Sequence, residues 1–434
     1  MAVWFDPTQP GVATALDNAG YHMTRWPGGS DSDAYHWQTN TLCGGYANSN
    51  ATFDNFMNDV VKPAGLDLAI TINYGSNAAC NAGGDPAEAA AWVDYANNTK
   101  HYGVKYWTIG NEVYGGWEYD LHSPAHDAPT YANAVATGYY PQMKAKDPTI
   151  KVGVVVAGSY STQWDNTVLT QAKYDFVELH WYAQAPGSES DTYLLKQAPI
   201  DLANAVTAER SIMNANGVSP SVPIYLGEMN SVYTNPGKQT MSIVNGLFAG
   251  QAVAQLLNQG VPMATWWLAF GGCGVGNQSS SLYGWQNFGG YMASSDGTPE
   301  YGCSSAQATT FETPFPSARA YSVMAQFAVA GNRILPATVA ASLSSVRAYG
   351  ATKGAGYAVL LFNLDQNNAA TVTVNIAGAS RSSFSASSVV YGKKQYDDSK
   401  NGVWTAPLSA NLGTVGKTFS VTLPVWSMTV VTLQ

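Results

Sequence analysis

Apolar and polar residues follow two different patterns in the two parts of this chain. From residue 1 to about residue 330, short apolar segments alternate with segments whose apolar residues recur at helical spacing. The apolar segments predict eight strands: Ala2–Phe5, Tyr21–Trp26, Asp67–Asn73, Val104–Ile109, Ile150–Ala157, Phe176–Tyr182, Pro223–Gly227 and Met263–Ala269. Strands that alternate with helices are typical of parallel βα units, and eight of them predict a closed (β/α)8 TIM barrel over residues 1–330.

Helix ends are also visible between the predicted strands. Asp85 followed by Pro86 and by Glu88 is a typical helix start, with an N-cap, a proline at the first position and a capping-box acid. Apolar residues at helical spacing predict a helix from about Thr240 to Asn258 and a last one over Ser317–Ala330.

After residue 331 the apolar residues recur at every second position, which is typical of half-buried strands. The segments are Tyr357–Asn363, Thr371–Ile376, Ser388–Tyr391, Thr418–Leu423 and Ser427–Leu433. They predict an antiparallel β-sandwich over residues 331–434. The predicted fold class is therefore α/β, a TIM barrel with a C-terminal antiparallel β-sandwich domain.

Composition narrows the class of ligand. Charged residues make up 11% of the 434 residues and the net charge is −9, which argues against nucleic acid and against an anionic membrane surface. No uninterrupted apolar run approaches the roughly 20 residues of a membrane span. Aromatic residues make up 12%, and an uncharged surface rich in hydroxyls and rings suits a neutral polysaccharide or oligosaccharide. No cofactor is predicted, and the oligomeric state is left open.

The chain has four cysteines, and none belongs to a CxxC pair, so a zinc site is not expected. Three pairings are possible. We favour Cys43–Cys80 and Cys273–Cys303, because the members of each pair are near in sequence and lie in loops rich in Gly, Asn and Ser. Two disulfides predict a secreted or extracellular protein, with the periplasm as an alternative. No signal peptide is visible at Met1.

Two predicted strands end in a glutamate with unusual neighbours. Glu112 follows Ile109-Gly110-Asn111, and Glu228 follows Leu226-Gly227. By this count they follow strands four and seven, and we expect them to face each other across the barrel mouth, where such barrels carry their catalytic groups. A single glutamate there is often only a solvated loop residue. Two carboxylates across one pocket are what glycoside hydrolysis requires, one to protonate the leaving oxygen and one to attack.

These motifs resemble the clan A glycoside hydrolases. Ile109-Gly110-Asn111-Glu112 is similar to their acid/base motif and Leu226-Gly227-Glu228 to their nucleophile strand. Arg25-Trp26-Pro27-Gly28-Gly29, the later Tyr35-His36-Trp37 and the C-terminal Leu423–Thr429 segment are most similar to family 51, with family 39 next. Members usually carry a further strand upstream of the barrel, and nothing precedes Ala2 here except Met1.

The resemblance implies a retaining mechanism with Glu112 as general acid/base and Glu228 as nucleophile. It implies that Asn111 binds the hydroxyl beside the anomeric carbon, and Arg25 belongs to the same set of substrate-binding residues. We further expect Tyr182 to hold Glu228, with a packed Tyr as the alternative. His180 and Asn73 are expected to contact sugar hydroxyls. For His180, an equal alternative is a buried histidine whose hydrogen bonds are all made within the protein. One of Trp266 and Trp267 is expected to form a stacking platform at the mouth and the other to lie in the core.

The aromatic loops Val113–Tyr119 and Tyr283–Phe288 favour an endo-β-glycanase that acts on glucan or xylan. The main alternative is an α-L-arabinofuranosidase, and an alternative of another class is a non-catalytic carbohydrate-binding protein. Asp31 and Asp33 either touch substrate or cap a turn. His122, His126 and Asp127 share one loop, but their spacing fits no strong metal motif, and no metal is predicted.

Overall fold

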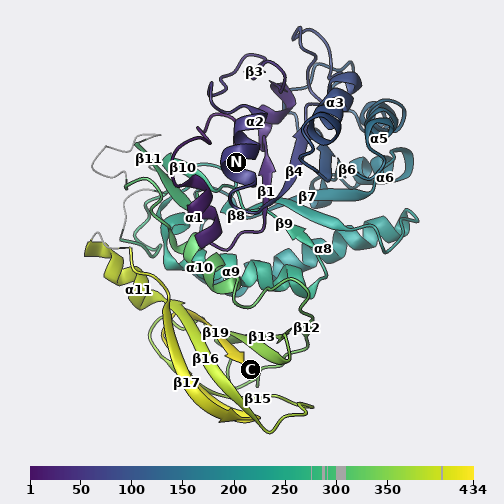
Figure 1. Ribbon diagram of the computed structural model, residues 1–434. Helices are drawn as coiled ribbons and strands as arrows, with labels where there is room; N and C mark the ends of the chain where they lie inside the picture. Colours follow the sequence, from purple (N-terminus) through teal and green to yellow (C-terminus); the bar gives the residue numbers. More distant parts are fainter. Residues whose placement is uncertain (275, 286–288, 291, 300–308, 402–403) are drawn as a thin grey trace.

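The computed structural model describes residues 1–434 apart from 275, 286–288, 291, 300–308 and 402–403. Its centre is a parallel sheet in the order β1-β4-β5-β6-β7-β8-β9, which curves into a nearly closed barrel (Figure 1). The seven strands are β1 (Met23–Trp26), β4 (Asp67–Ile72), β5 (Tyr106–Ile109), β6 (Lys151–Val155), β7 (Phe176–Gln184), β8 (Ile224–Val232) and β9 (Met263–Ala264).

Helices connect these strands and cover the outside of the sheet. They are α1 (Val12–Asn18), α2 (Phe53–Asn55), α3 (Pro86–Val93), α4 (Ala128–Ala134), α5 (Tyr140–Lys146), α6 (Thr162–Gln171), α7 (Asp191–Lys196), α8 (Ala198–Ala215), α9 (Ile243–Asn258) and α10 (Pro316–Met324). The Asp85 side chain accepts a hydrogen bond from Ala87 N at 2.8 Å, so α3 starts where its cap predicts. Ser242 caps α9 in the same way, and α10 is six residues shorter at its C-terminus than its pattern predicts.

The prediction of a strand at Ala2–Phe5 is wrong. These residues form a turn in which Phe5 N donates to Ala2 O, and the Phe5 ring stacks on Phe270 at 5.1 Å. Their apolar character therefore reflects burial in a turn, which a short apolar run cannot distinguish from a strand. Consequently the strands of Glu112 and Glu228 are third and sixth in the sheet, not fourth and seventh. The TIM-barrel class itself is confirmed.

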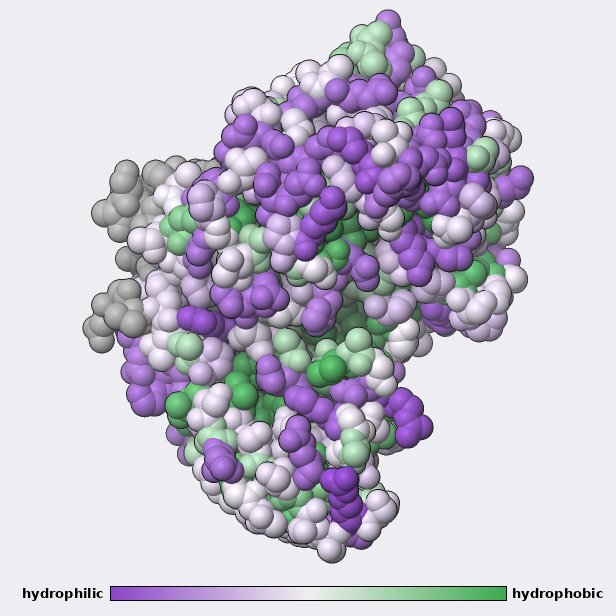
Figure 2. Space-filling view, viewed as in Figure 1, coloured by the Kyte–Doolittle hydropathy of each residue, from purple (hydrophilic) through white to green (hydrophobic). Residues whose placement is uncertain are grey.

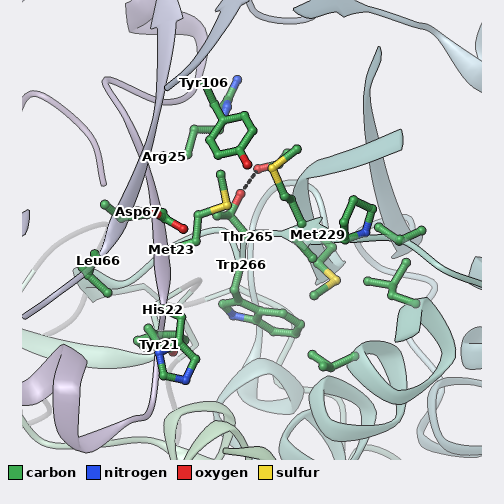
Figure 3. Close-up of a pocket in the computed structure, with 18 of the residues that line it drawn as sticks. Tyr21, His22, Met23, Arg25, Leu66, Asp67, Tyr106, Met229, Thr265 and Trp266 are labelled. Atoms are coloured by element: carbon green, nitrogen blue, oxygen red, sulfur yellow. Dashed lines mark hydrogen bonds between the residues drawn. The ribbon is translucent and has the colours of Figure 1, made fainter. Parts of the chain in front are cut away.

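A cavity of about 890 Å³ opens along the seam between β1 and β9 and continues under the amino ends of the strands (Figure 3). Met23, Met229, Met263 and Trp266 give it an apolar wall, and Asp67 and Tyr106 also line it. Neither Glu112 nor Glu228 lines it. This cavity is therefore not the place where the two carboxylates meet.

The C-terminal part forms two antiparallel sheets that pack as a sandwich. The larger sheet has the order β12-β13-β14-β19-β16-β17 and the smaller one pairs β15 with β18. The strands are β12 (Ile334–Leu335), β13 (Val346–Lys353), β14 (Gly356–Asn363), β15 (Ala370–Asn375), β16 (Ser383–Gly392), β17 (Leu408–Gly416), β18 (Thr418–Leu423) and β19 (Ser427–Leu433). A short helix, α11 (Lys393–Asp398), follows β16. The domain division between residues 330 and 331 stays a prediction.

The sandwich packs on the barrel through α9 and α10, which lie between the two parts (Figure 1). Gln255 Nε2 on α9 donates to the Tyr349 hydroxyl at 3.1 Å, and Arg319 on α10 donates to Trp404 O at 2.8 Å. Gly250 allows the close approach, because a Cβ there would lie 2.9 Å from Met428 Cε. On the face shown in Figure 2, hydrophobic residues gather near this junction while the barrel above is mostly hydrophilic.

Two small two-stranded sheets complete the fold. β2 (Tyr35–His36) pairs antiparallel with β3 (Thr41–Leu42), and β10 (Phe270–Cys273) pairs parallel with β11 (Ser294–Pro299). Among the described residues, no helix is both long and apolar enough to cross a membrane.

The predicted disulfide between Cys43 and Cys80 is present, whereas the second predicted pair includes Cys303, which lies outside the described residues. The bond closes a loop with a sequence separation of 37.

Replacing both cysteines by alanine should lower the free energy of unfolding by about 3–4 kcal/mol, because a loop of this length gains entropy when the unfolded chain is no longer cross-linked. Urea unfolding of the double variant and the oxidised wild type measures this, and equal midpoints would contradict it.

Candidate active site

Glu112 and Glu228 lie at the carboxyl-end mouth of the barrel. Glu112 follows β5 by three residues, and Glu228 lies within β8. One carboxylate oxygen of each, together with a ring nitrogen of His180, forms a group whose atoms all lie within 4.8 Å of one another. This separation agrees with the roughly 5–5.5 Å of retaining glycosidases and lies below the roughly 6.5–9.5 Å of inverting ones.

The backbone before Glu112 adopts a conformation that requires glycine. Gly110 has a φ of 77°, and a Cβ at this position would lie 2.6 Å from Val113 Cγ1. Glu112 itself has a φ of 39°, which is uncommon for a residue with a side chain. Such backbone strain is concentrated at functional sites, because surrounding contacts must hold it in place.

Gly227 serves a different purpose beside Glu228. The pairing of β7 with β8 shifts register between Leu179 and His180, so that His180 pairs with Glu228 and Gly227 is left over as a bulge. A Cβ on Gly227 would lie 2.1 Å from Glu178 Oε1. The glycine therefore leaves room for a third carboxylate under the site.

Two side chains hold the Glu228 carboxylate, which is 6% exposed. Arg25 Nη1 from β1 donates to Oε1 at 2.8 Å, and the Tyr182 hydroxyl from β7 donates to Oε2 at 2.7 Å. Each oxygen thus has a donor, which fixes the orientation of the carboxylate.

Glu112 is held by His180 and Trp117. His180 Nδ1 lies 2.8 Å from Glu112 Oε1, and Trp117 Nε1 donates to Oε2 at 3.0 Å. Burial alone would raise the pKa of Glu112, but the hydrogen bond and charge of His180 outweigh it and lower that pKa. Burial lowers the pKa of His180, whereas Glu228, Glu112 and Glu178 together raise it to about 10. At neutral pH His180 is therefore an imidazolium that faces the ionised carboxylates of Glu112 and Glu178.

Glu178 on β7 was not among the residues predicted from the sequence. It is 1% exposed and forms an ion pair with Arg25 Nε at 2.8 Å, while its second oxygen accepts from the Thr108 hydroxyl. Burial raises its pKa, but the charges of Arg25 and His180 outweigh this and lower it. A glutamate inside the apolar strand Phe176–Leu179 was the available signal, since unpaired buried charges are costly.

Asn111 is locked by contacts at both ends of its amide. Its Oδ1 accepts from Arg25 Nη2 at 2.8 Å and its Nδ2 donates to Glu118 Oε1 at 3.0 Å. Glu118 was likewise missed by the sequence analysis. Burial and the charges of Asp33 and Glu112 raise the pKa of Glu118 to about 9, so it is protonated at neutral pH.

Asp33 connects two loops of the mouth. Its oxygens accept from Tyr74 N at 3.0 Å and from Asn111 N at 2.8 Å. Burial raises the pKa of Asp33 to about 8 despite these two hydrogen bonds. These contacts join segments far apart in the sequence and are not a cap on the turn at Gly28 and Gly29, and a contact of Asp33 with substrate stays a prediction.

The remaining predicted residues lie around this centre. Asn73 donates to Tyr35 O and to the Ser76 hydroxyl, both at 3.1 Å, so its amide holds the loop after β4. Trp266 and Trp267 both line the cavity between β1 and β9; Trp266 packs against Tyr321 at 5.8 Å, and the Trp267 ring lies against Gly29. Sugar contacts by these residues stay predictions.

The loop with His122, His126 and Asp127 is held by hydrogen bonds within itself. Asp120 accepts from the backbone N of His122 and of His126, and Asp127 caps α4 by accepting from Thr130 N. Among the described residues, two clusters bring possible metal ligands together: His36 with Cys43 and Cys80, whose cysteines form the disulfide, and Glu112 with His180 and Glu228. In the second cluster the cations Arg25 and His180 already face the carboxylates, so a further cation would have to displace them.

No family model matches the sequence. Solved structures, however, match nearly the whole chain. The GH51 alpha-L-arabinofuranosidase from Thermotoga petrophila superposes with a TM-score of 0.71 at 18% identity, covering 100% of this chain and 92% of that one. A family 44 xyloglucanase from Paenibacillus polymyxa gives 0.68 at 14% identity, with 96% and 94% covered. This chain has the fold of the clan A glycoside hydrolases.

Curated relatives point to the same clan A group. Alpha-L-arabinofuranosidase C from Emericella nidulans is 28% identical over 191 residues, which are 37% of this chain and 34% of the relative. An exo-alpha-(1->6)-L-arabinofuranosidase from Bifidobacterium longum is 37% identical over 89 residues, 19% of this chain and 16% of that protein. The matches thus span less than half of either relative. With the structures, they confirm the resemblance to clan A enzymes of the family 51 type.

Proposed function

We propose that this protein is a retaining glycoside hydrolase, with Glu112 as general acid/base and Glu228 as nucleophile. The observation that carries the proposal is the meeting of the two carboxylates within 4.8 Å at the barrel mouth. This distance leaves no room for the water that an inverting mechanism places beside the sugar, and it lets one carboxylate attack the anomeric carbon directly, as double displacement requires.

In the first step, Glu228 attacks the anomeric carbon and the bond to the leaving oxygen breaks as that oxygen receives a proton from Glu112. Arg25 and Tyr182 hold the Glu228 carboxylate in a fixed orientation. Asn111, held by Arg25 and Glu118, is oriented to bind the neighbouring hydroxyl, a contact that strengthens in an oxocarbenium-like transition state.

In the second step, Glu112 acts as a base. Its carboxylate takes a proton from water, the resulting hydroxide attacks the anomeric carbon, and Glu228 leaves as a carboxylate. Two inversions at one carbon give net retention of configuration. The same two residues therefore serve both halves of the reaction.

For the substrate, we infer an α-L-arabinofuranoside. The curated relatives are named arabinofuranosidases, as is the GH51 structure from Thermotoga petrophila. The expectation of an endo-β-glycanase on glucan or xylan is not confirmed, and the comparisons support its alternative better.

One observation still favours a longer leaving group. Trp117 is 55% exposed and Tyr160 is 60% exposed, and their rings pack edge to face at 5.3 Å beside Glu112. Exposed rings next to the acid form a surface on which a leaving sugar can stack. An endo-β-glycanase is therefore the second candidate. The chain also shares its fold with a xyloglucanase.

A panel of nitrophenyl glycosides, arabinoxylan, xylan and glucan tests the proposal, with products followed by NMR. Release of single arabinose units, first with the anomeric configuration of the substrate, is the expected result. Oligosaccharide products from xylan or glucan would favour the second candidate. Binding of a glycan with no hydrolysis of any substrate would favour the non-catalytic carbohydrate-binding alternative, and inverted products would exclude Glu228 as nucleophile.

Trp117→Ala should raise KM for an oligosaccharide substrate about 3- to 10-fold, the equivalent of losing roughly 0.5–1.5 kcal/mol of ring contact. Trp117→Phe is the matched control, because it keeps a ring but loses the Nε1 donor to Glu112. Steady-state kinetics of both variants separate stacking from the hydrogen bond. An unchanged KM in Trp117→Ala would show that the leaving group does not lie on this ring.

We also propose that the protein works outside the cytoplasm. The Cys43–Cys80 disulfide supports this, since such bonds persist mainly in oxidising compartments.

A further inference from the structure

We propose that Glu178, His180 and Glu112 form one proton-holding triad, in which His180 stores the proton that Glu112 delivers to the leaving oxygen. The inference rests on the proposed function and deepens it. It makes His180 a positioning residue that acts through Glu112, rather than the contact to sugar hydroxyls expected from the sequence.

The first argument is that Glu178 fixes which ring nitrogen of His180 can exchange a proton. His180 Nε2 lies 3.0 Å from Glu178 Oε1, and Arg25 and Thr108 hold that carboxylate in place. An ionised carboxylate only accepts hydrogen bonds, so Nε2 must keep its proton and donate it. Nδ1 is then the one ring position whose proton can move, as in the Asp-His pair of serine proteases.

The second argument is the contact that Nδ1 makes. It lies 2.8 Å from Glu112 Oε1, and the His180 side chain is 3% exposed. The same hydrogen bond serves two states: an imidazolium donating to a carboxylate, and a carboxylic acid donating to a neutral imidazole. Moving the proton between them therefore needs no rearrangement of heavy atoms.

The charges that face His180 determine where the proton rests. Glu178 on β7, Glu112 after β5 and Glu228 on β8 surround the ring, with Glu228 Oε2 3.7 Å from Nδ1. Arg25 on β1 contacts Glu178 and Glu228, and the Tyr182 hydroxyl contacts Glu228. Three carboxylates and one guanidinium leave an excess of negative charge, which favours a stored proton on His180. In agreement, the pKa of His180 is raised to about 10 and that of Glu112 is lowered.

The lowered pKa of Glu112 is the reason why a proton store is needed. A general acid that acts alone is usually kept protonated by a raised pKa. Here Glu112 is ionised at neutral pH in the free protein, so a proton for the leaving oxygen must come from the hydrogen-bonded imidazolium.

The proton cycle balances over the two steps. In the first, the Nδ1 proton passes to Glu112 and the Glu112 carboxylic acid protonates the leaving oxygen, while the bond from Glu228 to the anomeric carbon forms. Ester formation removes the negative charge 3.7 Å from Nδ1, which weakens the hold of His180 on its proton at that moment. In the second, Glu112 takes a proton from water and returns it to Nδ1, and the Glu228 charge reappears.

His180→Gln tests the triad, with His22→Gln as the matched control because His22 is exposed. We expect the alkaline limb of kcat/KM, near pH 10 in the wild type, to move by two or more pH units to lower pH in His180→Gln. We also expect hydrolysis of an alkyl glycoside to fall at least about tenfold more than that of a nitrophenyl glycoside, since only the former depends on acid assistance. A purely structural role of His180 would lower the rates on both substrates by the same factor and would leave the alkaline limb of kcat/KM at its wild-type pH. Either of these two results would overturn the proposal.

A measurement on the wild type needs neither activity nor a folded variant. The chain has six histidines, and 15N-labelled histidine reports by NMR which ring nitrogens carry protons. We expect one ring protonated on both nitrogens at pH 8, and its absence would overturn the triad. If the wild type hydrolyses no glycoside, the proposed function fails. If the wild type hydrolyses a glycoside but the alkaline limb of kcat/KM does not move in His180→Gln, the proposed function stands and only the proposed triad is wrong.

Discussion

Glu228→Gln is expected to lower kcat by at least about 10⁴-fold on every substrate, including those with activated leaving groups. The amide cannot attack the anomeric carbon, so the covalent intermediate does not form. The loss should not depend on the leaving group, because the nucleophile is needed whichever group departs. Steady-state rates on two nitrophenyl glycosides of different leaving ability measure it.

Glu209→Gln is the matched control for this substitution. Glu209 on α8 is 1% exposed, and burial and the neighbouring Asp165 raise its pKa to about 8, so it is already neutral at pH 7. The same exchange there should leave the rate unchanged. Activity of Glu228→Gln within tenfold of this control would remove Glu228 from the mechanism.

Glu112→Gln is expected to show a loss that depends on the leaving group. For an alkyl glycoside or an oligosaccharide, kcat/KM should fall by about 10²–10⁴-fold, the usual contribution of general acid catalysis. For a dinitrophenyl glycoside the first step needs little acid, so a burst of nitrophenolate followed by slow turnover is expected. Stopped-flow kinetics detect the burst.

Glu112→Ala provides the complementary test. Removing the carboxylate opens space beside the anomeric carbon, where a small anion such as azide can replace water. We expect azide to restore turnover of the dinitrophenyl substrate and to yield a glycosyl azide of retained configuration. If azide has no effect and both leaving groups suffer equally, Glu112 is not the acid/base residue.

Helix starts and alternating strands could be predicted from the sequence, because residues close together in the chain determine them. The Asp85 side chain caps α3 through the backbone two residues ahead, and Ser242 does the same for α9. The strand patterns around β14, β15, β18 and β19 likewise follow from alternation within each segment. By contrast, β17 was missed, because this edge strand is almost wholly exposed and has no apolar alternation to detect.

The candidate site divides in the same way. The sequence by itself determined that Glu112 and Glu228 each belong to a glycine-containing motif on a barrel strand or just after one, since short motifs carry that information. Only the tertiary structure decided which residues hold these two carboxylates. Glu178 and Arg25 are 153 residues apart in the sequence (178 − 25), and the residue pattern of neither segment indicates that they form an ion pair. The tertiary structure also decided that Ala2–Phe5 is a turn and that His180 faces carboxylates, because burial and charge environment are set by chain segments that meet only in the folded barrel.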